Sequence, residues 1–402
     1  MAVHLPSISI IFRQLAGTFI QRSARGVAVL IVKDDTEGKG GPYYRFGDAT
    51  QIPEGEFTAQ NEQYIRDALS FGPLRAAVVK IGTSGQLAQA LAVLVQKEQT
   101  GWITVCGGAS KDWTDLTSWI KAREKEEKSW KAVVYNASAP DCMHIVNLTN
   151  ANVVFADDRG KQTGEKYTPS LAGLLAACNV ERGATNALCA NLTSVEVPED
   201  PEAAVGSGKF LLINVDDQVR VGVDVNSLTT VDGSTRTEDM KYIETVEAMD
   251  MMRDDIAQAF RQDYMGKYRN STANQMLFLA AVNEYFRQLG EENVLDPEHD
   301  NTAQVDVESQ RNAWIGAGKT EAADWDDGKV LATPLQAPAV PGGGCEDPGD
   351  HGRPEVRGHP DVRRRTHGSV QENHARQHLR RVHQRRAGRP AHQDRGQDDR
   401  RL

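Results

Sequence analysis

The first part of the chain alternates continuous apolar runs with segments whose apolar residues recur every three or four positions. The apolar runs fall at residues 27–35, 74–82, 102–106 and 130–136. Continuous runs of this length are typical of strands buried on both faces, whereas the three-to-four spacing is typical of helices with one buried face. Helical segments are expected from the cap residue Thr58 to about residue 71, after Ser84, and over 111–127. This alternation predicts a mostly parallel sheet with flanking helices.

The same region is expected to continue to about residue 205. The apolar stretches 144–148 and 151–158 predict further strands of the sheet. Thr168 and Pro169 then open a short apolar helix, SLAGLLAAC, in the order of cap and first helical residue. The polar stretch VPEDPEAAVGSG has the composition of a linker. We therefore assign residues 26–205 to one α/β domain.

Residues 206–336 have a different pattern and form the second predicted domain. Strict alternation of valines after Asp216 and Asp217 predicts two strands around that acidic pair. One helix is predicted over about 240–264, and another from Ser271 or Thr272 to Gly290. The sequence VDVES (305–309) predicts a last short strand. The sum is an α+β domain that is one or two strands short of a complete sheet.

Residues 1–25 contain a lone strand, because Ile8, Ile10 and Phe12 alternate on one face after Pro6. A lone terminal strand needs another sheet to pair with. The unfinished sheet of the second domain likewise has an edge that can accept a strand. Both features predict an assembly role through strand addition between chains.

Composition divides the 402 residues into an acidic body and a basic tail. Residues 341–402 hold 14 Arg and nine acidic residues, a net charge of +5, with no Lys, Ile, Met, Phe, Tyr or Trp; the other 340 residues carry a net charge of −15. We expect residues 337–402 to be disordered, because this composition cannot form a core. Taken at face value, the tail is also a candidate nucleic-acid arm, with Arg clusters at 363–365, 380–381 and 385–386. It has no aromatic residue on which a base could stack.

Other classes of protein find little support in the chain. No apolar run approaches the roughly 18 residues of a membrane span, and no secretory signal is visible, so we expect no membrane anchor and assembly in a cytoplasm. The five cysteines are scattered without a CxxC pair, and the only histidines before residue 341 are His4, His144 and His299. We interpret His144 as a structural histidine beside a strand. No catalytic or metal-ligand pattern emerges, so no enzyme activity and no cofactor are predicted.

One short motif supports an alternative function. The sequence GAGKT, from Gly316 to Thr320, resembles the end of a phosphate-binding loop of nucleotide-binding proteins. The full motif needs a glycine where this chain has Ala313, a preceding buried strand and a following helix. A P-loop-like nucleotide-binding α/β protein is therefore kept as the alternative. The GTSG sequence at 82–85 does not match the nucleophile pattern GxSxG, so we interpret Ser84 as a helix cap.

Several longer segments resemble a known family. LPSISIIF (5–12) followed by RSARGVAVLIVKDD (22–35) is similar to the opening of tail sheath proteins from contractile phage tails and phage-tail-like bacteriocins of Gram-positive bacteria. The similarity returns at YTPSLAGLLA (167–176), RVGVDVNSLTT (220–230) and in the segment 250–286. These segments occur in the family's order, and the similarity covers most of residues 1–330.

The resemblance implies a structural protein with no catalytic residues and no cofactor. It implies hexameric rings stacked into a tube around a tail tube protein, with baseplate and tail-terminator proteins at the ends. It also implies that terminal arms add strands to neighbouring subunits and that contraction drives the tube through the host envelope. By this likeness Ile8, Ile10 and Phe12 belong to the arm, residues 26–205 to the outer domain and residues 206–336 to the inner, lattice-forming domain. The protein would then be part of a virion tail.

The C-terminus departs from the family, whose members end in two strands around a Met-Glu-Asp turn. Here the chain has the Arg-, Gly-, Pro- and His-rich tail. Permitted codons for Val340 to Val362, read one base later, encode FLAADVKILETMEDLKFEVILM and a stop when Arg363 begins with A. This peptide contains two segments with the alternating apolar pattern of strands, DVKIL and KFEVIL, with the family's Met-Glu-Asp turn between them, and it is followed by a stop codon. We therefore hypothesise a one-base frame change between about Pro334 and Val340.

The frame hypothesis predicts that the 402-residue chain assembles poorly. Without the C-terminal hairpin, the edge of the inner sheet stays unpaired and its apolar face uncovered, which favours aggregation. A frame-corrected protein should form tubes in negative-stain electron microscopy where the 402-residue chain forms few. Indistinguishable tubes from the two proteins, or gene codons incompatible with the shifted peptide, would contradict the hypothesis.

Overall fold

A computed structural model describes residues 20, 25–38, 40–178, 182–233 and 235–334. Within them the chain forms two compact units, one from Arg22 to Asp254 and one that starts at Asp255. The predicted arm strand with Ile8, Ile10 and Phe12 lies outside the described residues, and so does the predicted tail 337–402.

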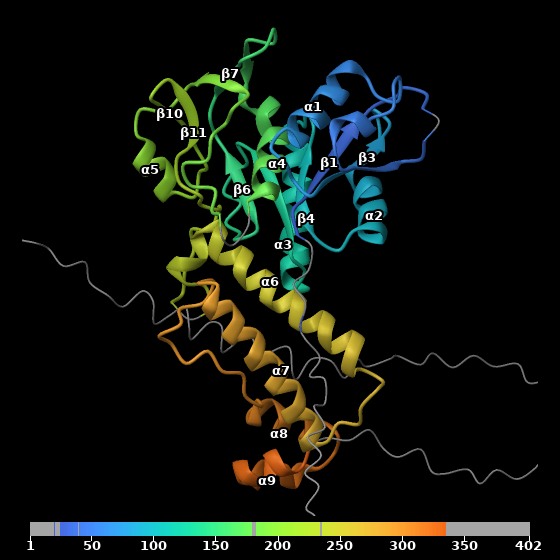
Figure 1. The fold of residues 1–402 in the computed structure, drawn as a ribbon, viewed down its shortest axis with the longest axis vertical. Coiled ribbons are helices and arrows are strands. Elements are labelled where there is room, and N and C mark those ends of the chain that lie inside the picture. The colour runs from blue at the N-terminus through green and yellow to red at the C-terminus, as the bar shows by residue number, and fades with distance from the viewer. Residues whose placement is uncertain (1–19, 21–24, 39, 179–181, 234, 335–402) are drawn as a thin grey trace, which may run out of the picture. The chain divides into compact units, whose positions relative to one another are not determined.

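The first unit is built on a six-stranded sheet (Figure 1). Across the sheet the strands are β2 (Tyr43–Phe46), β3 (Arg75–Ile81), β1 (Val27–Lys33), β4 (Gly101–Val105), β5 (Trp130–Tyr135) and β6 (Ile145–Leu148). All neighbouring pairs are parallel except β2 and β3, which are antiparallel. The predicted mostly parallel sheet is therefore confirmed, and the apolar runs form its central strands because both of their faces are buried.

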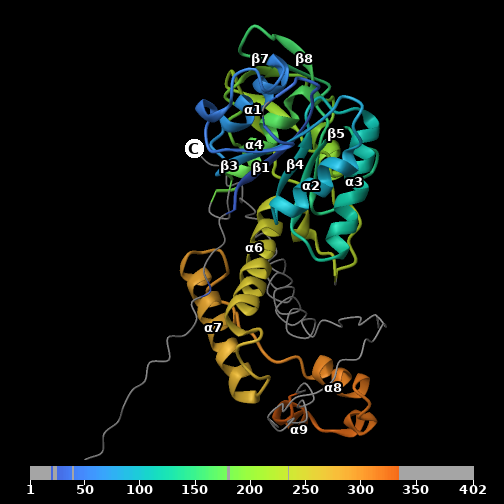
Figure 2. The same cartoon turned by 90° about the vertical axis from the view of Figure 1, so that its right-hand side faces the viewer.

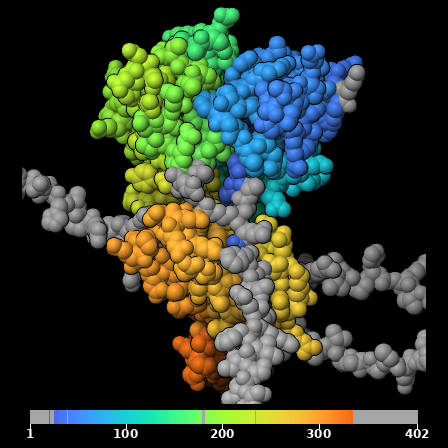
Figure 3. All heavy atoms as spheres, in the orientation of Figure 1, coloured from blue at the N-terminus to red at the C-terminus, as the bar shows by residue number. Residues whose placement is uncertain are grey.

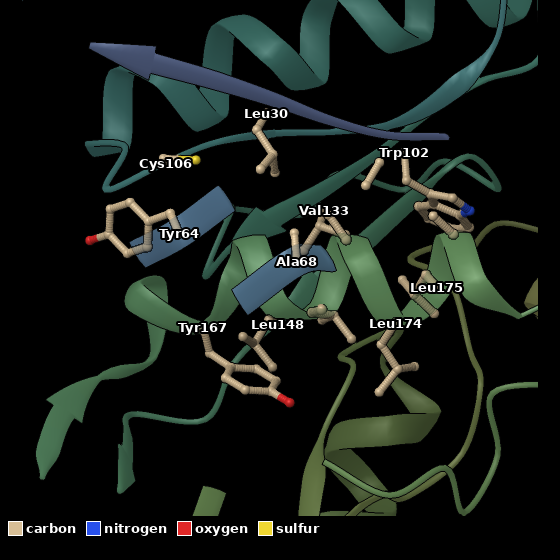
Figure 4. Close-up of a cluster of buried hydrophobic side chains, with 14 of the residues drawn as sticks. Leu30, Tyr64, Ala68, Trp102, Cys106, Val133, Leu148, Tyr167, Leu174 and Leu175 are labelled. Atoms are coloured by element: carbon tan, nitrogen blue, oxygen red, sulfur yellow. The ribbon is translucent and has the colours of Figure 1, made fainter. Parts of the chain in front are cut away.

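Helices cover both faces of this sheet. α1 (Ala59–Leu69) and α4 (Thr168–Ala177) pack on one face, and α2 (Leu87–Lys97) and α3 (Ser110–Lys125) on the other. Alternate residues of β1 point to opposite layers, so Leu30 packs with the α1–α4 layer and Ile31 with the α2–α3 layer. Figure 4 shows Leu30, Ala68 and Leu175 gathered in the α1–α4 layer.

The start of each helix tests the predicted caps. Thr58 caps α1, as predicted, with its hydroxyl accepting from the backbone N–H of Asn61 at 3.4 Å. The prediction that Ser84 caps the next helix is wrong, because residues 82–85 close a turn through the N–H of Gly85 and the carbonyl of Gly82. That turn delays α2, whose cap position is Gln86.

The edge strand β2 is short and polar. It has four residues, and Arg45, which is half exposed, pairs with the carboxylate of Glu98 at 2.9 Å. Tyr43 donates to the same carboxylate at 2.5 Å, and Arg75 of β3 binds it at 2.7 Å. An edge of this kind offers little uninterrupted backbone to a foreign strand.

Two small sheets follow the main one, so the predicted extension of the main sheet by residues 151–158 is wrong. β7 (Asn152–Phe155) pairs with β8 (Lys161–Thr163) and β9 (Leu192–Val195), and β10 (Leu212–Val215) pairs with β11 (Gln218–Val221). The chain leaves the main sheet at Asn150, whose side chain bonds both the N–H and the carbonyl of Leu212. The predicted hairpin at Asp216 and Asp217 is confirmed, with both residues at positive φ as a two-residue turn requires.

The first unit continues beyond residue 205, the boundary expected from the sequence. The stretch expected to be a linker contains the helix α5 (Pro201–Gly206). After it, the buried Phe210 donates its N–H to the carbonyl of Asn147 at 2.8 Å and extends the edge of the sheet next to β6. One continuous apolar core joins the main sheet to the small sheets. In Figure 3 the green to yellow-green part of the first unit lies directly beside its blue part.

Every regular element in the described residues of the second unit is a helix or a helical turn (Figure 2). It takes up the end of α6 (Ile243–Ala259) and continues with a π-helical turn (Phe260–Tyr264), α7 (Thr272–Glu291), α8 (Val307–Gly316) and α9 (Asp327–Ala332). A 3-10 turn, Thr320–Asp324, lies between α8 and α9, and the first unit has three others, at Ala49–Gln51, Gly164–Tyr167 and Glu238–Lys241. The strand predicted at VDVES is wrong, because Asp306 accepts from the N–H of Ser309 at 2.9 Å and so starts α8.

Close contact of α1 and α4 generates a prediction for Gly173. A Cβ at this position would lie 2.1 Å from the carbonyl oxygen of Ala68, which belongs to the backbone of α1. We expect Gly173→Ala to lower the free energy of unfolding by about 3 kcal/mol, since overpacking against a backbone cannot relax through a side chain. Urea denaturation measures it.

Gly206 supplies the matched control, because a Cβ there meets nothing within 4 Å. Gly206→Ala, at the end of α5 in the same unit, should be neutral or should stabilise by less than about 1 kcal/mol. Equal effects of the two substitutions would contradict the packing argument.

Candidate functional site

A buried cluster of charged side chains holds the first half of α6 against the main sheet. We call it the ionic cluster; its members are Arg25, Glu124, Lys131, His144, Glu247, Asp250, Arg253 and Asp254. Lys131 of β5, with a side chain only 4% exposed, lies 2.7 Å from Glu247 and 3.7 Å from Asp250. Charges this deeply buried persist only when they are paired.

Asp250 is the centre of the cluster. Its carboxylate lies 3.1 Å from Nε2 of His144, 3.0 Å from Arg253 and within reach of Lys131. Burial by itself raises the pKa of Asp250, but these three cationic neighbours outweigh burial and hold that pKa well below its ordinary value. The carboxylate is therefore ionised, and α6, β5 and the start of β6 all supply its partners.

His144 is held between two carboxylates. Its Nδ1 lies 2.9 Å from Oε2 of Glu124, at the end of α3, and its Nε2 faces Asp250. Burial lowers the pKa of His144, but the charge of Asp250 and the hydrogen bonds to both carboxylates raise it well above the ordinary value. The imidazole is thus protonated and donates from both nitrogens, in agreement with the structural role predicted for it.

Cys142 shares the carboxylate that His144 contacts. Its Sγ lies 2.9 Å from Oε2 of Glu124, and burial raises the pKa of the Cys142 thiol. Burial by itself raises the pKa of the Glu124 carboxyl. The hydrogen bond from His144 and the other nearby groups lower it by more, so the pKa of Glu124 lies below its ordinary value. Among the described residues, Glu124, Cys142 and His144 form the group whose ligand atoms, all within 4.8 Å of one another, could hold a metal ion.

The ionic cluster extends to the entry of β1. Arg25 binds Asp254 at 3.1 Å and Glu247 at 3.6 Å. Trp102 of β4 donates its indole N–H to Glu247 at 3.0 Å. The first half of α6 is therefore bound to Arg25, two residues before β1, and to β4 and β5.

The second unit has an aromatic core with apolar residues exposed beside it in the sequence. Phe278 of α7 packs edge-on against Phe260 at 5.3 Å and against Tyr264 at 4.9 Å between ring centroids. Met265, Tyr268 and Met276, which lie between these positions, are each about half exposed. A large exposed apolar side chain is a candidate for contact with another molecule when several occur together.

The GAGKT motif does not form a phosphate-binding loop. Gly316 is the last residue of α8, so the motif follows a helix where the loop requires a strand. The ammonium group of Lys319 lies 4.8 Å from the ring centroid of Trp314 and 5.9 Å from that of Trp325. Lys319 is therefore engaged in cation–π contacts, and the alternative of nucleotide binding at Gly316 to Thr320 finds no support.

Several further residues have ordinary positions. Met240, Met251 and Met252 are buried core residues, and Met249 is partly buried. Asp157 and Asp158 occupy an exposed turn. No helix of the described residues is long and apolar enough to cross a membrane.

The ionic cluster itself was not predicted from the sequence. Several of its pairs join positions more than a hundred residues apart, such as Lys131 and Glu247. Two signals could have indicated it: a lysine inside the apolar run of β5, and acidic residues at 247, 250 and 254, which are spaced along one face of a predicted helix. Neither signal identifies the partner.

Comparison with known proteins gives a consistent result. Residues 235–326 match the family model described as the phage tail sheath C-terminal domain. The tail sheath protein of Clostridium phage phiCD119 is 29% identical over 317 residues, which cover 76% of this chain and 86% of that protein.

Solved structures share the fold. The sheath tail protein of Desulfitobacterium hafniense has a TM-score of 0.61 at 16% identity, covering 76% of this chain and 94% of that chain. The helical sheath of the anti-feeding prophage in its contracted state has a TM-score of 0.57 at 14% identity, covering 72% and 85%. The sheath complex of an extracellular contractile injection system, also contracted, has a TM-score of 0.56 at 14% identity, covering 76% and 88%.

The geometry of the ionic cluster generates a prediction for Lys131. Replacing it with methionine leaves Glu247 and Asp250 short of a buried partner, so Lys131→Met should lower the free energy of unfolding by about 3–5 kcal/mol. Denaturation by urea, followed by tryptophan fluorescence, measures the change.

Lys161 serves as the matched control, since its side chain is 67% exposed and only 4.0 Å from Glu196. Lys161→Met should change stability by less than about 1 kcal/mol. A Lys131→Met protein as stable as the control would show that the cluster does not hold α6 in place.

Proposed function

This chain belongs to the tail sheath proteins of contractile phage tails and related injection systems, and we propose that it polymerises into stacked hexameric rings around an inner tail tube. It is a structural sheath subunit. In the proposed mechanism the lattice of subunits shortens and drives the tube through the host envelope. The protein then forms part of a virion tail, meets baseplate and terminator proteins at the two ends, and is assembled in the host cytoplasm.

The observation that supports this proposal most strongly is the extent of the match to tail sheath proteins. The alignment with the phage phiCD119 protein covers 86% of that protein. The matched C-terminal sheath domain, residues 235–326, includes the end of the first unit and most of the described second unit. The likeness therefore involves both units rather than one shared module.

The exposed apolar residues of the second unit support a lattice-forming role for it. Met265, Tyr268 and Met276 lie within the matched sheath domain and are half exposed in a single chain. Because about half of each side chain is already buried, covering the rest between subunits would contribute about 0.7–1.5 kcal/mol each. We assign subunit contacts to residues 206–336 and the outer surface to residues 26–205.

We further propose that residues 1–25 act as an arm that adds a strand to a neighbouring subunit. The support is the alternation of Ile8, Ile10 and Phe12 ahead of a unit whose own main sheet is already complete without them. Backbone hydrogen bonds would supply affinity, and the three apolar side chains would supply register. No catalytic step is assigned to the chain, because a sheath subunit works through its contacts.

The arm proposal is tested by replacing its predicted inner face. In the frame-corrected protein, combined Ile8→Ser, Ile10→Ser and Phe12→Ser should weaken association between subunits more than about 100-fold, since each tenfold corresponds to 1.4 kcal/mol. Negative-stain microscopy should then show single rings or free subunits in place of long tubes.

Ile11 is the control, because in a strand it faces the opposite side from Ile10 and Phe12. Ile11→Ser should leave tube length unchanged. If the triple variant forms tubes as long as the control does, the arm does not link the rings. If the frame-corrected protein without these substitutions forms neither rings nor tubes, the polymerisation proposal fails.

A further inference from the structure

We propose that Glu124, Cys142 and His144 form a binding site for one divalent zinc-like metal ion at the edge of the ionic cluster. This goes beyond the sheath function, which needs no metal, and it does not depend on that function. The three side chains come from the end of α3 and from the segment between β5 and β6.

The geometry places three different metal-binding atoms around one point. Oε2 of Glu124 lies 2.9 Å from Nδ1 of His144 and 2.9 Å from Sγ of Cys142. All three atoms lie within 4.8 Å of one another. Cys142 and His144 lie two residues apart in one segment, and the fold brings Glu124 of α3 to this pair.

The other ring nitrogen of His144 has the environment of a metal ligand. Nε2 faces the carboxylate of Asp250 at 3.1 Å, which leaves Nδ1 directed at Glu124 and Cys142. A carboxylate that binds the second nitrogen of a ligating histidine fixes the ring and increases its basicity, a common arrangement around zinc. Asp250 is in turn held by Lys131 and Arg253, so this support is rigid.

The donor set selects the kind of metal. A thiol sulfur, an imidazole nitrogen and a carboxylate oxygen suit zinc or cobalt, whereas calcium and magnesium bind sets of oxygen atoms. Ligands around a tetrahedral zinc ion lie about 3.3–3.6 Å apart, given bond lengths of about 2.0–2.3 Å. Glu124 would therefore move outward by several tenths of an ångström.

Glu124 is the residue that can make this movement. Its side chain is 15% exposed, while Cys142 and His144 are 1% exposed as residues. The site thus opens toward solvent on the Glu124 side, which gives the metal an entry. Three protein ligands leave a fourth position for water.

Metal binding needs free lone pairs on the sulfur of Cys142 and on Nδ1 of His144, so any proton on either atom leaves to solvent as the ion binds. The other ion pairs of these residues use different atoms. Arg236 lies 3.4 Å from Oε1 of Glu124, whereas the proposed ligand atom is Oε2, and Lys131 and Arg253 contact Asp250 rather than a ligand.

Cobalt titration of the 402-residue protein tests the site. After treatment with a chelator, Co²⁺ should bind at one equivalent and produce the absorption band of a cobalt–thiolate bond, and Zn²⁺ should displace it. Cys142→Ser should abolish the band, and Asp250→Asn should weaken binding about 10–100-fold through its effect on His144.

Two other cysteines provide controls. Cys178 is the least buried of the four cysteines in the described residues and Cys106 is buried elsewhere in the core, so Cys178→Ser and Cys106→Ser should keep the band. A band that survives Cys142→Ser would overturn the proposal. So would the absence of any band in the unsubstituted protein, a result that requires no variant to fold.

Discussion

The buried carboxylate of Asp250 sets the constraint on which the arrangement of the first unit depends. An ionised group with no exposure to water is tolerated only where cationic partners surround it, and here they come from β5, from the start of β6 and from α6 itself. Moving any one of these elements would leave the charge uncompensated. The interaction therefore specifies one position of α6 on the sheet, where apolar packing alone would tolerate several.

The same helix, α6, continues past Asp250 into the second unit. α6 begins in the first unit and its last turns belong to the second, where Tyr285 of α7 donates to the buried Asp255 at 2.7 Å. Polar anchors thus occur on both parts of one helix.

Local patterns predicted the elements that local physics determines. The apolar runs of β1, β3, β4 and β5 are strands because they are buried on both faces, and Thr58 caps α1 because its hydroxyl reaches an unpaired N–H. VDVES failed because one capping carboxylate, Asp306, outweighs a weak alternation of valines. The ionic cluster could not be predicted, because many of its partners are distant in sequence. GAGKT shows the opposite case: the sequence resembles part of a motif, but it lies at the end of a helix, where Lys319 contacts tryptophan rings. The role of Ile8, Ile10 and Phe12 stays a prediction.

The polar edge strand β2 has a consequence for the proposed exchange of strands between subunits. Such a polymer brings many identical sheets close together, so every accessible edge competes for the arms of neighbours. A four-residue edge whose Arg45 is tied to Glu98 is a poor acceptor, and the opposite edge, next to β6, is occupied by the chain's own Phe210. Neither edge of the main sheet is then a good site for a neighbour's arm. In the proposed lattice, correct growth would depend on these closed edges as well as on the edges that accept an arm.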